Sequence, residues 1–388
     1  MEAYIFNTVR TPRGAFRKGS LKDVAPIELL LPLLQRLRED SRLIDKVNDV
    51  ILGCVTQTNL QGANIAKTAL LVAGYPESVP GMTVNRYCTS GLDAILLAAA
   101  KVNSGIGDFV LAGGVESCSL VPMFSDHGPW FADPVISEKT KFIPIGLSAD
   151  LMASNNDYSR QQLDEYACHS HERAASATKQ GCFLKSMVSL PSLSEDECIR
   201  LGMTVESMEH LSSTFNEDKR QMWESRIQPF GKGIIHYHHP GNSPVLADGA
   251  ALLPISGKRA GEEAGLKPRA RIVHAVNVST DPLLLNGGEE ATIRLLKEVN
   301  RSPDEIDLFE VYEAYAATVL QYKEKFDIPI EKLNTNGGVI AMGHALGATG
   351  AMMTMTLLDE LERRELKTGI VAMSGGAGVG TAMLIERV

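Results

Sequence analysis

Strand-like and helix-like runs alternate near the start of this chain of 388 residues, and the same alternation returns near its end. Near the start, short apolar runs at 50–54 and 108–115 flank helix-like stretches at 63–71 and 91–102. Alternation of this kind is typical of parallel sheets with helices packed against them. The sequence therefore predicts an α/β fold.

The last third of the chain repeats the pattern. Runs at 271–278, 308–311 and 369–374 have the composition of strands, and those at 291–299 and 348–361 have the composition of helices. The repetition predicts two similar halves, and the chain length fits two or three packed domains.

The middle of the chain differs from both ends. Polar helix-like stretches at 159–179 and 204–211 alternate with irregular runs that contain Pro, Gly and His. Insertions of this length are usually lids or binding loops, so we expect this one to cover one face of the core. The predicted limits are 1–117 for the first half, completed by about 245–265, then 118–244 for the insertion and 266–388 for the second half.

Charge and hydropathy exclude several classes of partner. The formal net charge is −9 and no basic block stands out, which argues against nucleic acid and anionic membranes but not against a phosphate-bearing ligand. The longest apolar stretches, near 29–34 and 92–100, are too short to span a bilayer. The chain opens on a strand-like run and ends in Glu386-Arg387-Val388, without a secretory or peroxisomal signal, so we expect a cytoplasmic protein.

One of the six cysteines stands at a position that suits chemistry. The six show no CxxC spacing, and most should be reduced and buried. Cys88 follows a strand-like run at 81–85 and precedes a helix that begins near Gly91. Unpaired amides and the helix dipole at such a junction favour a thiolate, which is the nucleophilic form. The alternative is a buried cysteine beside a capping Thr89 or Ser90, and this segment alone does not decide between them.

His344 stands between a glycine-rich loop and a helix that begins near Ala348. A histidine there could activate a thiol or donate a hydrogen bond to a thioester oxygen. The alternative is a hydrogen-bonded core histidine. A second glycine loop, at 373–380, could aim backbone amides at a developing oxyanion. Its glycine spacing does not indicate a dinucleotide site, because no βαβ unit can follow so near the chain end.

Together, and in this order, these segments resemble the thiolase family over nearly the whole chain. The length and the compact middle are most similar to the bacterial 3-ketoacyl-CoA thiolases of fatty-acid oxidation. Further motifs that carry the resemblance are Val9-Arg10-Thr11-Pro12, Gly113-Gly114-Val115-Glu116-Ser117, Gly241-Asn242-Ser243 with Asp248-Gly249-Ala250, and Glu310-Val311-Tyr312-Glu313-Ala314-Tyr315-Ala316.

The resemblance implies a five-layer αβαβα fold made of two similar halves and an insertion that forms part of the coenzyme A site. Cys88 would be the acylated nucleophile and His344 its activator. The amides of Cys88 and Gly376 would form one oxyanion hole, and His344 with a water the other. When a thiolate attacks a thioester, the thioester formed has nearly the same energy as the one broken, and a thiolate is also a good leaving group. Both properties suit covalent catalysis.

The resemblance also implies partners. Coenzyme A would be a substrate and not a resident cofactor, and no cofactor is expected. We expect a homodimer or homotetramer, with a fatty-acid oxidation complex as a further implied partner. The residues expected beside coenzyme A are Pro240, Ser243, Leu246, Ala314 and Tyr315.

The sequence departs from the family pattern at the site. Ser374 stands where the family has a second cysteine that acts as acid and base, and a hydroxyl is a poor proton shuttle near neutral pH. Tyr312 replaces an asparagine that holds the oxyanion-hole water, although a phenol can still donate a hydrogen bond. Ala345 replaces a proline and Pro244 a serine. Deprotonating acetyl-CoA at carbon, or the incoming thiol, would need a base at position 374, whereas a decarboxylating condensation would not.

Three functions therefore stay open at this stage. The first is an acyl-CoA C-acyltransferase that cleaves 3-ketoacyl-CoA or condenses acyl-CoAs. The second is a Cys–His acyltransferase of altered, decarboxylating chemistry, and the third is an acyl-CoA-binding subunit. The histidines in 236–239 could suit a metal, but no carboxylate or cysteine is fixed nearby in sequence, so we expect none and assign the run to packing of the coenzyme A loop.

Overall fold

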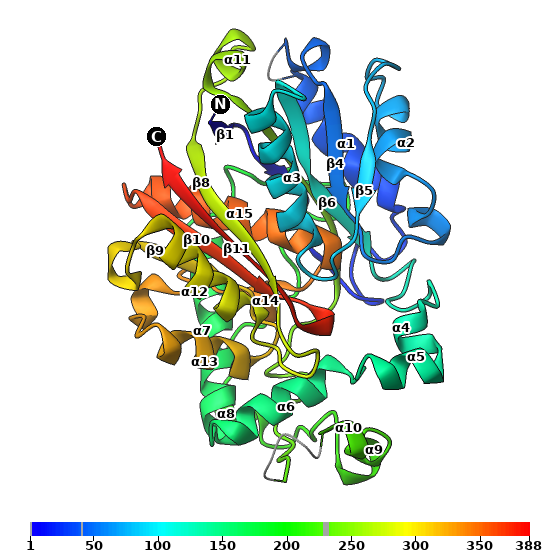
Figure 1. Cartoon of the computed structure of the whole chain (residues 1–388), viewed down its shortest axis with the longest axis vertical. Coiled ribbons are helices and arrows are strands. Elements are labelled where there is room, and N and C mark those ends of the chain that lie inside the picture. The colour runs from blue at the N-terminus through cyan, green and yellow to red at the C-terminus, as the bar shows by residue number, and fades with distance from the viewer. Residues whose placement is uncertain (1, 40–41, 228–232) are drawn as a thin grey trace.

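A computed structural model describes residues 2–39, 42–227 and 233–388 (Figure 1). Within these ranges the strands form one eleven-stranded mixed sheet, in the order β5-β4-β6-β7-β1-β8-β11-β10-β9, with β2 and β3 also paired to β7. The strands are β1 Ala3–Ile5, β2 Val9–Arg10, β3 Gly14–Ala15, β4 Asp49–Gly53, β5 Met82–Val84, β6 Phe109–Ser117, β7 Ala247–Gly257, β8 Ala270–Ser279, β9 Leu308–Val311, β10 Thr368–Ser374 and β11 Val379–Arg387.

Two halves of this sheet meet at β1. That three-residue strand pairs with β7 of the first half and, through only Tyr4 and Ile5, with β8 of the second. The resemblance implies two sheet layers, and here the hydrogen bonds run continuously from the strands of one half to those of the other. The reason is local, because β1 lies between β7 and β8 and is antiparallel to both.

Helices lie on both faces of each half and between the halves. α1 and α2 pack on the first half, α12 packs on β8, β10 and β11, and α3 and α15 pack against each other between the halves. This is the expected layered α/β arrangement. The helices of the two halves are α1 Pro26–Glu39, α2 Ile65–Val72, α3 Ser90–Ser104, α11 Lys258–Glu263, α12 Gly287–Val299, α13 Ala316–Lys325, α14 Val339–Met342 and α15 Leu346–Arg363.

Glycines let the two central helices approach closely. A Cβ on Gly91 of α3 would lie 2.5 Å from the carbonyl oxygen of Gly347 in α15, and one on Gly114 would lie 2.0 Å from the same atom. No side chain fits there, so part of the glycine-rich pattern serves helix packing. The contact brings the helices that follow Cys88 and His344 together.

The prediction of parallel sheets is right for β4, β5 and β6 and for β9 with β10, but wrong for the rest. β7 runs antiparallel to β6, and β11 runs antiparallel to β10 and β8. Neither β7 nor β11 was recognised as a strand. β11 follows β10 through a short glycine turn and β7 follows the long middle segment, so neither connection is a βαβ crossover of the kind that alternation predicts.

The middle segment carries mainly helices. Figure 1 shows α4–α6 and α8–α10 gathered at its lower end, away from most of the sheet. The predicted stretch at 204–211 is helical only over α8, and the domain limits themselves stay a prediction. Among the described residues, no helix has the length and hydropathy that crossing a bilayer requires. The helices are α4 Pro129–Ala132, α5 Pro134–Lys139, α6 Ile145–Asn155, α7 Arg160–Lys179, α8 Val205–Met208, α9 Glu217–Gln221 and α10 Glu224–Ile227.

Candidate active site

Cys88 lies in the tight turn that joins β5 to α3. The preceding Tyr87 has a left-handed backbone, with φ of 49°. The amides of Thr89 and Ser90 donate to the carbonyls of Arg86 and Tyr87, at 3.2 and 3.1 Å, and α3 begins at Ser90. The cysteine is only 8% exposed, and it forms part of the wall of a cavity. The junction predicted from the sequence is therefore present.

The thiol itself does not have the protonation state predicted from that junction. Burial raises the pKa of Cys88, and this effect outweighs the hydroxyl of Tyr312 and the amides of Gly376 and Cys88, which lower the pKa. Desolvation disfavours the charged form of any thiol. The expectation of a resting thiolate is wrong, because the surrounding core removes water that a helix end alone would leave in place. Cys88 needs a base to become a nucleophile.

His344 provides a neutral imidazole beside Tyr312. The two rings lie 4.8 Å apart between centroids, and His344 Nδ1 lies 2.8 Å from Thr349 Oγ1. Burial, together with the charge of Arg13, lowers the pKa of His344 to about 3. Its Nε2 is buried without a hydrogen-bond partner among the described residues. When Nδ1 donates to Thr349, Nε2 carries the free lone pair and can accept a proton.

Tyr312 and Gly376 approach Cys88 from different strands. Tyr312 follows β9 and its hydroxyl faces the sulfur, although this buried oxygen has no hydrogen bond of good geometry with any described residue. Gly376 follows β10, and its amide is directed at the same sulfur. A Cβ on Gly376 would lie 2.9 Å from the ring of Trp130, so a side chain at this position would displace that ring. The two amides predicted for an oxyanion hole therefore both face the thiol.

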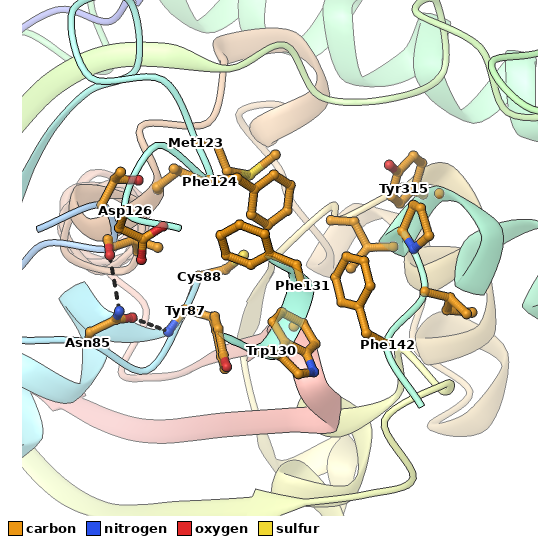
Figure 2. Close-up of a pocket in the computed structure, with 18 of the residues that line it drawn as sticks. Asn85, Tyr87, Cys88, Met123, Phe124, Asp126, Trp130, Phe131, Phe142 and Tyr315 are labelled. Carbon is orange, nitrogen blue, oxygen red and sulfur yellow. Dashed lines mark hydrogen bonds between the residues drawn. The ribbon is translucent and has the colours of Figure 1, made fainter. Parts of the chain in front are cut away.

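An apolar cavity of about 300 Å³ opens over Cys88. Figure 2 shows aromatic side chains of the middle segment gathered around the sulfur. The rings contact one another, because the centroid of the Trp130 ring lies 4.8 Å from the ring centroids of both Tyr87 and Phe142. The sequence reading missed this wall, although the aromatic cluster between 124 and 142 could have signalled it. The aromatic side chains of this wall include Phe124, Trp130, Phe131 and Phe142 of that cluster, together with Phe215 and Tyr315.

Ser374 does not line the cavity of Cys88. It ends β10, and its Oγ accepts a hydrogen bond from the amide of Gly288 at 2.9 Å. It lines a second, small cavity beneath the site, which Tyr312 also borders. Ser374, which stands at the family's acid–base position, therefore lies near the site without lining the cavity of Cys88, and its role stays a prediction.

The five residues expected beside coenzyme A occupy different surroundings. Tyr315 lines the cavity, Ala314 is buried, and Leu246 pairs through its backbone with the segment of His344. Ser243 is half-buried, and the carbonyl of the exposed Pro240 accepts a hydrogen bond from Arg200 at 3.0 Å. Of the five, only Tyr315 lines the cavity of Cys88, so the binding of coenzyme A beside these five residues stays a prediction.

The histidine run is held by carboxylates. Asp150 accepts hydrogen bonds from the Nδ1 atoms of His236 and His238, at 2.8 and 2.7 Å, and Asp164 lies 2.8 Å from His239 Nε2. In the described part of the chain, no cluster of three metal-ligating side chains is present. The run fixes the loop that precedes Gly241.

Fold and site together define a layered α/β protein in which a buried cysteine lines an apolar cavity and a buried histidine packs against Tyr312, whose hydroxyl faces that cysteine. Models of the thiolase family match most of the chain: "Thiolase, N-terminal domain" over residues 3–220 and "Thiolase, C-terminal domain" over residues 266–387. The chain belongs to the thiolase family.

Individual relatives agree with this assignment. A 3-ketoacyl-CoA thiolase of Klebsiella pneumoniae is 34% identical over 406 residues, which cover 100% of both chains. One of Idiomarina loihiensis is 34% identical over 400 residues, or 99% of each chain. The crystal structure of the Bacillus anthracis acetyl-CoA acetyltransferase superposes with a TM-score of 0.87 at 33% identity, covering 100% of this chain and 99% of that one.

Proposed function

We propose that this protein is an acyl-CoA C-acyltransferase, which cleaves 3-ketoacyl-CoA with coenzyme A or catalyses the reverse condensation through an acyl-cysteine at Cys88. The observation that carries the proposal is a buried thiol that faces two backbone amides and lines an apolar cavity, with a neutral histidine packed against the tyrosine that faces the same thiol. The names of the relatives, 3-ketoacyl-CoA thiolase and acetyl-CoA acetyltransferase, support the same reaction class.

The geometry supports the first half of the proposed reaction. His344 Nε2 accepts the proton of Cys88, and the sulfur attacks the carbonyl carbon in the cavity. The amides of Cys88 and Gly376 stabilise the oxyanion. When an acyl-CoA is the donor, the protonated His344 returns the proton to the leaving coenzyme A thiolate. Transfer from Cys88 to coenzyme A is the same step in reverse, so neither direction requires a proton at carbon.

The second half of the reaction is carbon chemistry. Cleavage must protonate the α-carbon of departing acetyl-CoA, and condensation must remove a proton from it. Because Ser374 replaces the family's thiol, a decarboxylating condensation is the second candidate, since loss of CO₂ forms the carbanion without a base. The two candidates share acylation of Cys88 and differ only afterwards.

The test combines intact mass with product analysis. Incubation with a panel of acyl-CoAs should add one acyl group to the wild type and none to Cys88→Ala, with Cys168→Ala as a control. Coenzyme A plus 3-ketoacyl-CoA should then yield two acyl-CoAs. If cleavage fails but malonyl-CoA gives product with CO₂ release, the second candidate replaces the first. Absence of acylation with every acyl-CoA would leave only a binding role.

We further propose a cytoplasmic homo-oligomer that acts on acyl-CoA of fatty-acid metabolism, with coenzyme A entering beside Tyr315 and Ser243. All six cysteines are free, which suits a reducing compartment. The edge strand β5 and exposed apolar side chains near it suit a subunit interface. Association with a fatty-acid oxidation complex rests on the resemblance alone.

A further inference from the structure

A small cavity lined in part by Tyr312 and Ser374 shares no lining residue with the cavity of Cys88. Its volume is about 10 Å³, close to the minimum of roughly 10–15 Å³ that one water molecule needs. It is bordered by the end of β9, the end of β10 and the start of α12. The polar residues that line it are Asn286, Glu289, Tyr312, Thr318, Gln321, Tyr322 and Ser374.

Two polar atoms around this cavity have no partner among the described residues. They are the hydroxyl of Tyr312 and Oδ1 of Asn286, and both atoms are buried. Tyr312 as a whole is only 2% exposed. Ser374 uses one lone pair to accept from the amide of Gly288, which leaves its second lone pair and its proton free. Buried polar atoms of this kind are normally satisfied by ordered water, and these can supply the partners that one water requires.

Glu289 places a carboxyl group at the same cavity. It lies in the first turn of α12, is 7% exposed, and accepts a hydrogen bond from Gln321 at 2.8 Å. Burial raises its pKa, an effect that Gln321 and Lys325 oppose and Glu290 reinforces. The other titratable groups that interact with Glu289 are Tyr158, whose hydroxyl donates to Glu324, and Tyr322.

We propose that Tyr312, one water in the small cavity and Glu289 form a relay that moves the proton at the α-carbon of the substrate. The inference rests on the proposed function and deepens it. Tyr312 is the residue that connects Cys88 to the small cavity, because its hydroxyl faces the Cys88 sulfur and the residue lines that cavity. Glu289 acts through Tyr312 and does not touch the substrate, while Ser374 and Asn286 hold the water.

The steps balance in both directions. In cleavage, Tyr312 donates its proton to the α-carbanion, the water donates to the phenol oxygen, and protonated Glu289 donates to the water. In condensation, the α-carbon gives its proton to the Tyr312 oxygen while the phenolic proton passes to the water and a proton passes on to ionised Glu289. Tyr312 keeps its proton overall, which suits a phenol whose pKa burial holds well above its ordinary value.

Solvent deuterium exchange measures this relay directly. In D₂O, acetyl-CoA bound to acylated wild type should exchange its α-protons, and Glu289→Gln should slow this exchange and carbon–carbon cleavage by ~10²–10⁴-fold, the usual value of general acid–base assistance. Glu290→Gln is the matched control, because it removes a charge from the same first turn of α12. Acyl exchange between Cys88 and coenzyme A should stay unchanged in both variants.

The pH profile separates a relay from a structural effect. In wild type, α-proton exchange should rise with pH as Glu289 ionises and then level off, and Glu289→Gln should lose this rise. Equal melting temperatures of the two Gln variants exclude a folding defect. If Glu289→Gln exchanges α-protons at the wild-type rate, the relay is excluded.

Ser374→Cys distinguishes the relay from direct proton transfer between the side chain at position 374 and the substrate. Because Ser374 helps to hold the water, the relay predicts that this variant cleaves no faster than wild type, and that adding Glu289→Gln slows cleavage further. A large gain in Ser374→Cys that no longer depends on Glu289 would overturn the proposal while leaving acyl transfer intact. Failure of Cys88 to become acylated in the wild type would instead contradict the proposed function itself.

Discussion

At the scale of single residues, burial controls the chemistry around Cys88. The same loss of water raises the pKa of the thiol and lowers that of His344. Both groups are therefore neutral at rest, and the proton must move between them as the substrate carbonyl is attacked. A neutral pair avoids the cost of holding an ion pair in an apolar site before substrate arrives.

The hydroxyl of Tyr312 should tune the thiol. Because it lowers the pKa of Cys88, Tyr312→Phe should raise that pKa further and move the pH profile of acylation toward higher pH. At neutral pH the acylation rate should fall about 10- to 100-fold, since a hydrogen bond to the ionised sulfur contributes ~1.5–3 kcal/mol. Rapid-quench mass spectrometry at several pH values measures this. Tyr75→Phe, which removes a buried hydroxyl elsewhere, should leave the profile in place.

The sequence could identify Cys88 and His344 but not their protonation states. Their neighbours in the chain are turn and helix-start residues, which indicate where each side chain stands. The water around them is removed by residues distant in the sequence, such as Trp130 and Phe215. Ser374 illustrates the same limit, because alignment gives its place in β10 but not that its hydroxyl turns toward Gly288.

At the scale of elements, local patterns predicted most strands and helices of the two halves. β9 matches its predicted range, and α12 and α15 extend theirs by a few residues. Gly249 and Pro254 interrupt the apolar run of β7, and β11 begins directly after the glycine loop, so neither segment stands out as the kind of short apolar run by which β4, β6 and β10 were predicted. The pairing of β1 with both halves depends on tertiary contacts that no local pattern contains.

Helix α4 should set the length of acyl chain that the cavity accepts. Trp130 covers Gly376 and contacts Phe142, so Trp130→Ala should enlarge the cavity beside Cys88. We expect the ratio of kcat/KM for long over short acyl-CoAs to rise about 10-fold or more, since each added methylene contributes ~1–3 kcal/mol in an apolar pocket. Trp130→Phe should shift this ratio less. An unchanged ratio in Trp130→Ala would show that the acyl chain lies elsewhere.

Helix α7 carries a histidine that should make stability depend on pH. Burial and Arg200 lower the pKa of His171 to about 4, and its Nδ1 accepts from the amide of Arg200 at 3.0 Å. The native state therefore keeps it neutral while the unfolded chain binds a proton below about pH 6.5. The contribution of neutral His171 to the free energy of unfolding is fully present above about pH 6.5 and is lost progressively toward pH 4.

His171→Asn removes the titrating group but keeps an acceptor for Arg200. Its free energy of unfolding should fall less steeply between pH 6.5 and 5 than that of wild type, by up to about 1.4 kcal/mol per pH unit. Urea unfolding at three pH values gives the slope. His169→Asn, on the exposed side of α7, should retain the wild-type slope. Equal slopes for all three proteins would contradict the assignment.

At the scale of the whole molecule, the sheet ends in an open edge. β5 is the last strand of the first half, and its outer side pairs with no described strand. Met82 on β5 is 40% exposed, and Leu71 on α2 and Leu97 on α3 are 49% and 43% exposed. An edge strand with apolar neighbours is a template for pairing with a second chain.

A second copy of the chain is therefore expected on the β5 edge. Light scattering at micromolar concentration should give twice the 42.0 kDa mass of one chain, or a larger multiple. Met82→Lys should shift the population to monomer, because a lysine on an edge strand opposes pairing. Leu201→Lys replaces an apolar side chain that is 80% exposed in the middle segment and should leave the mass unchanged. A wild type that stays at 42.0 kDa would exclude the dimer. If only Leu201→Lys lost assembly, the interface would lie in the middle segment and not at β5.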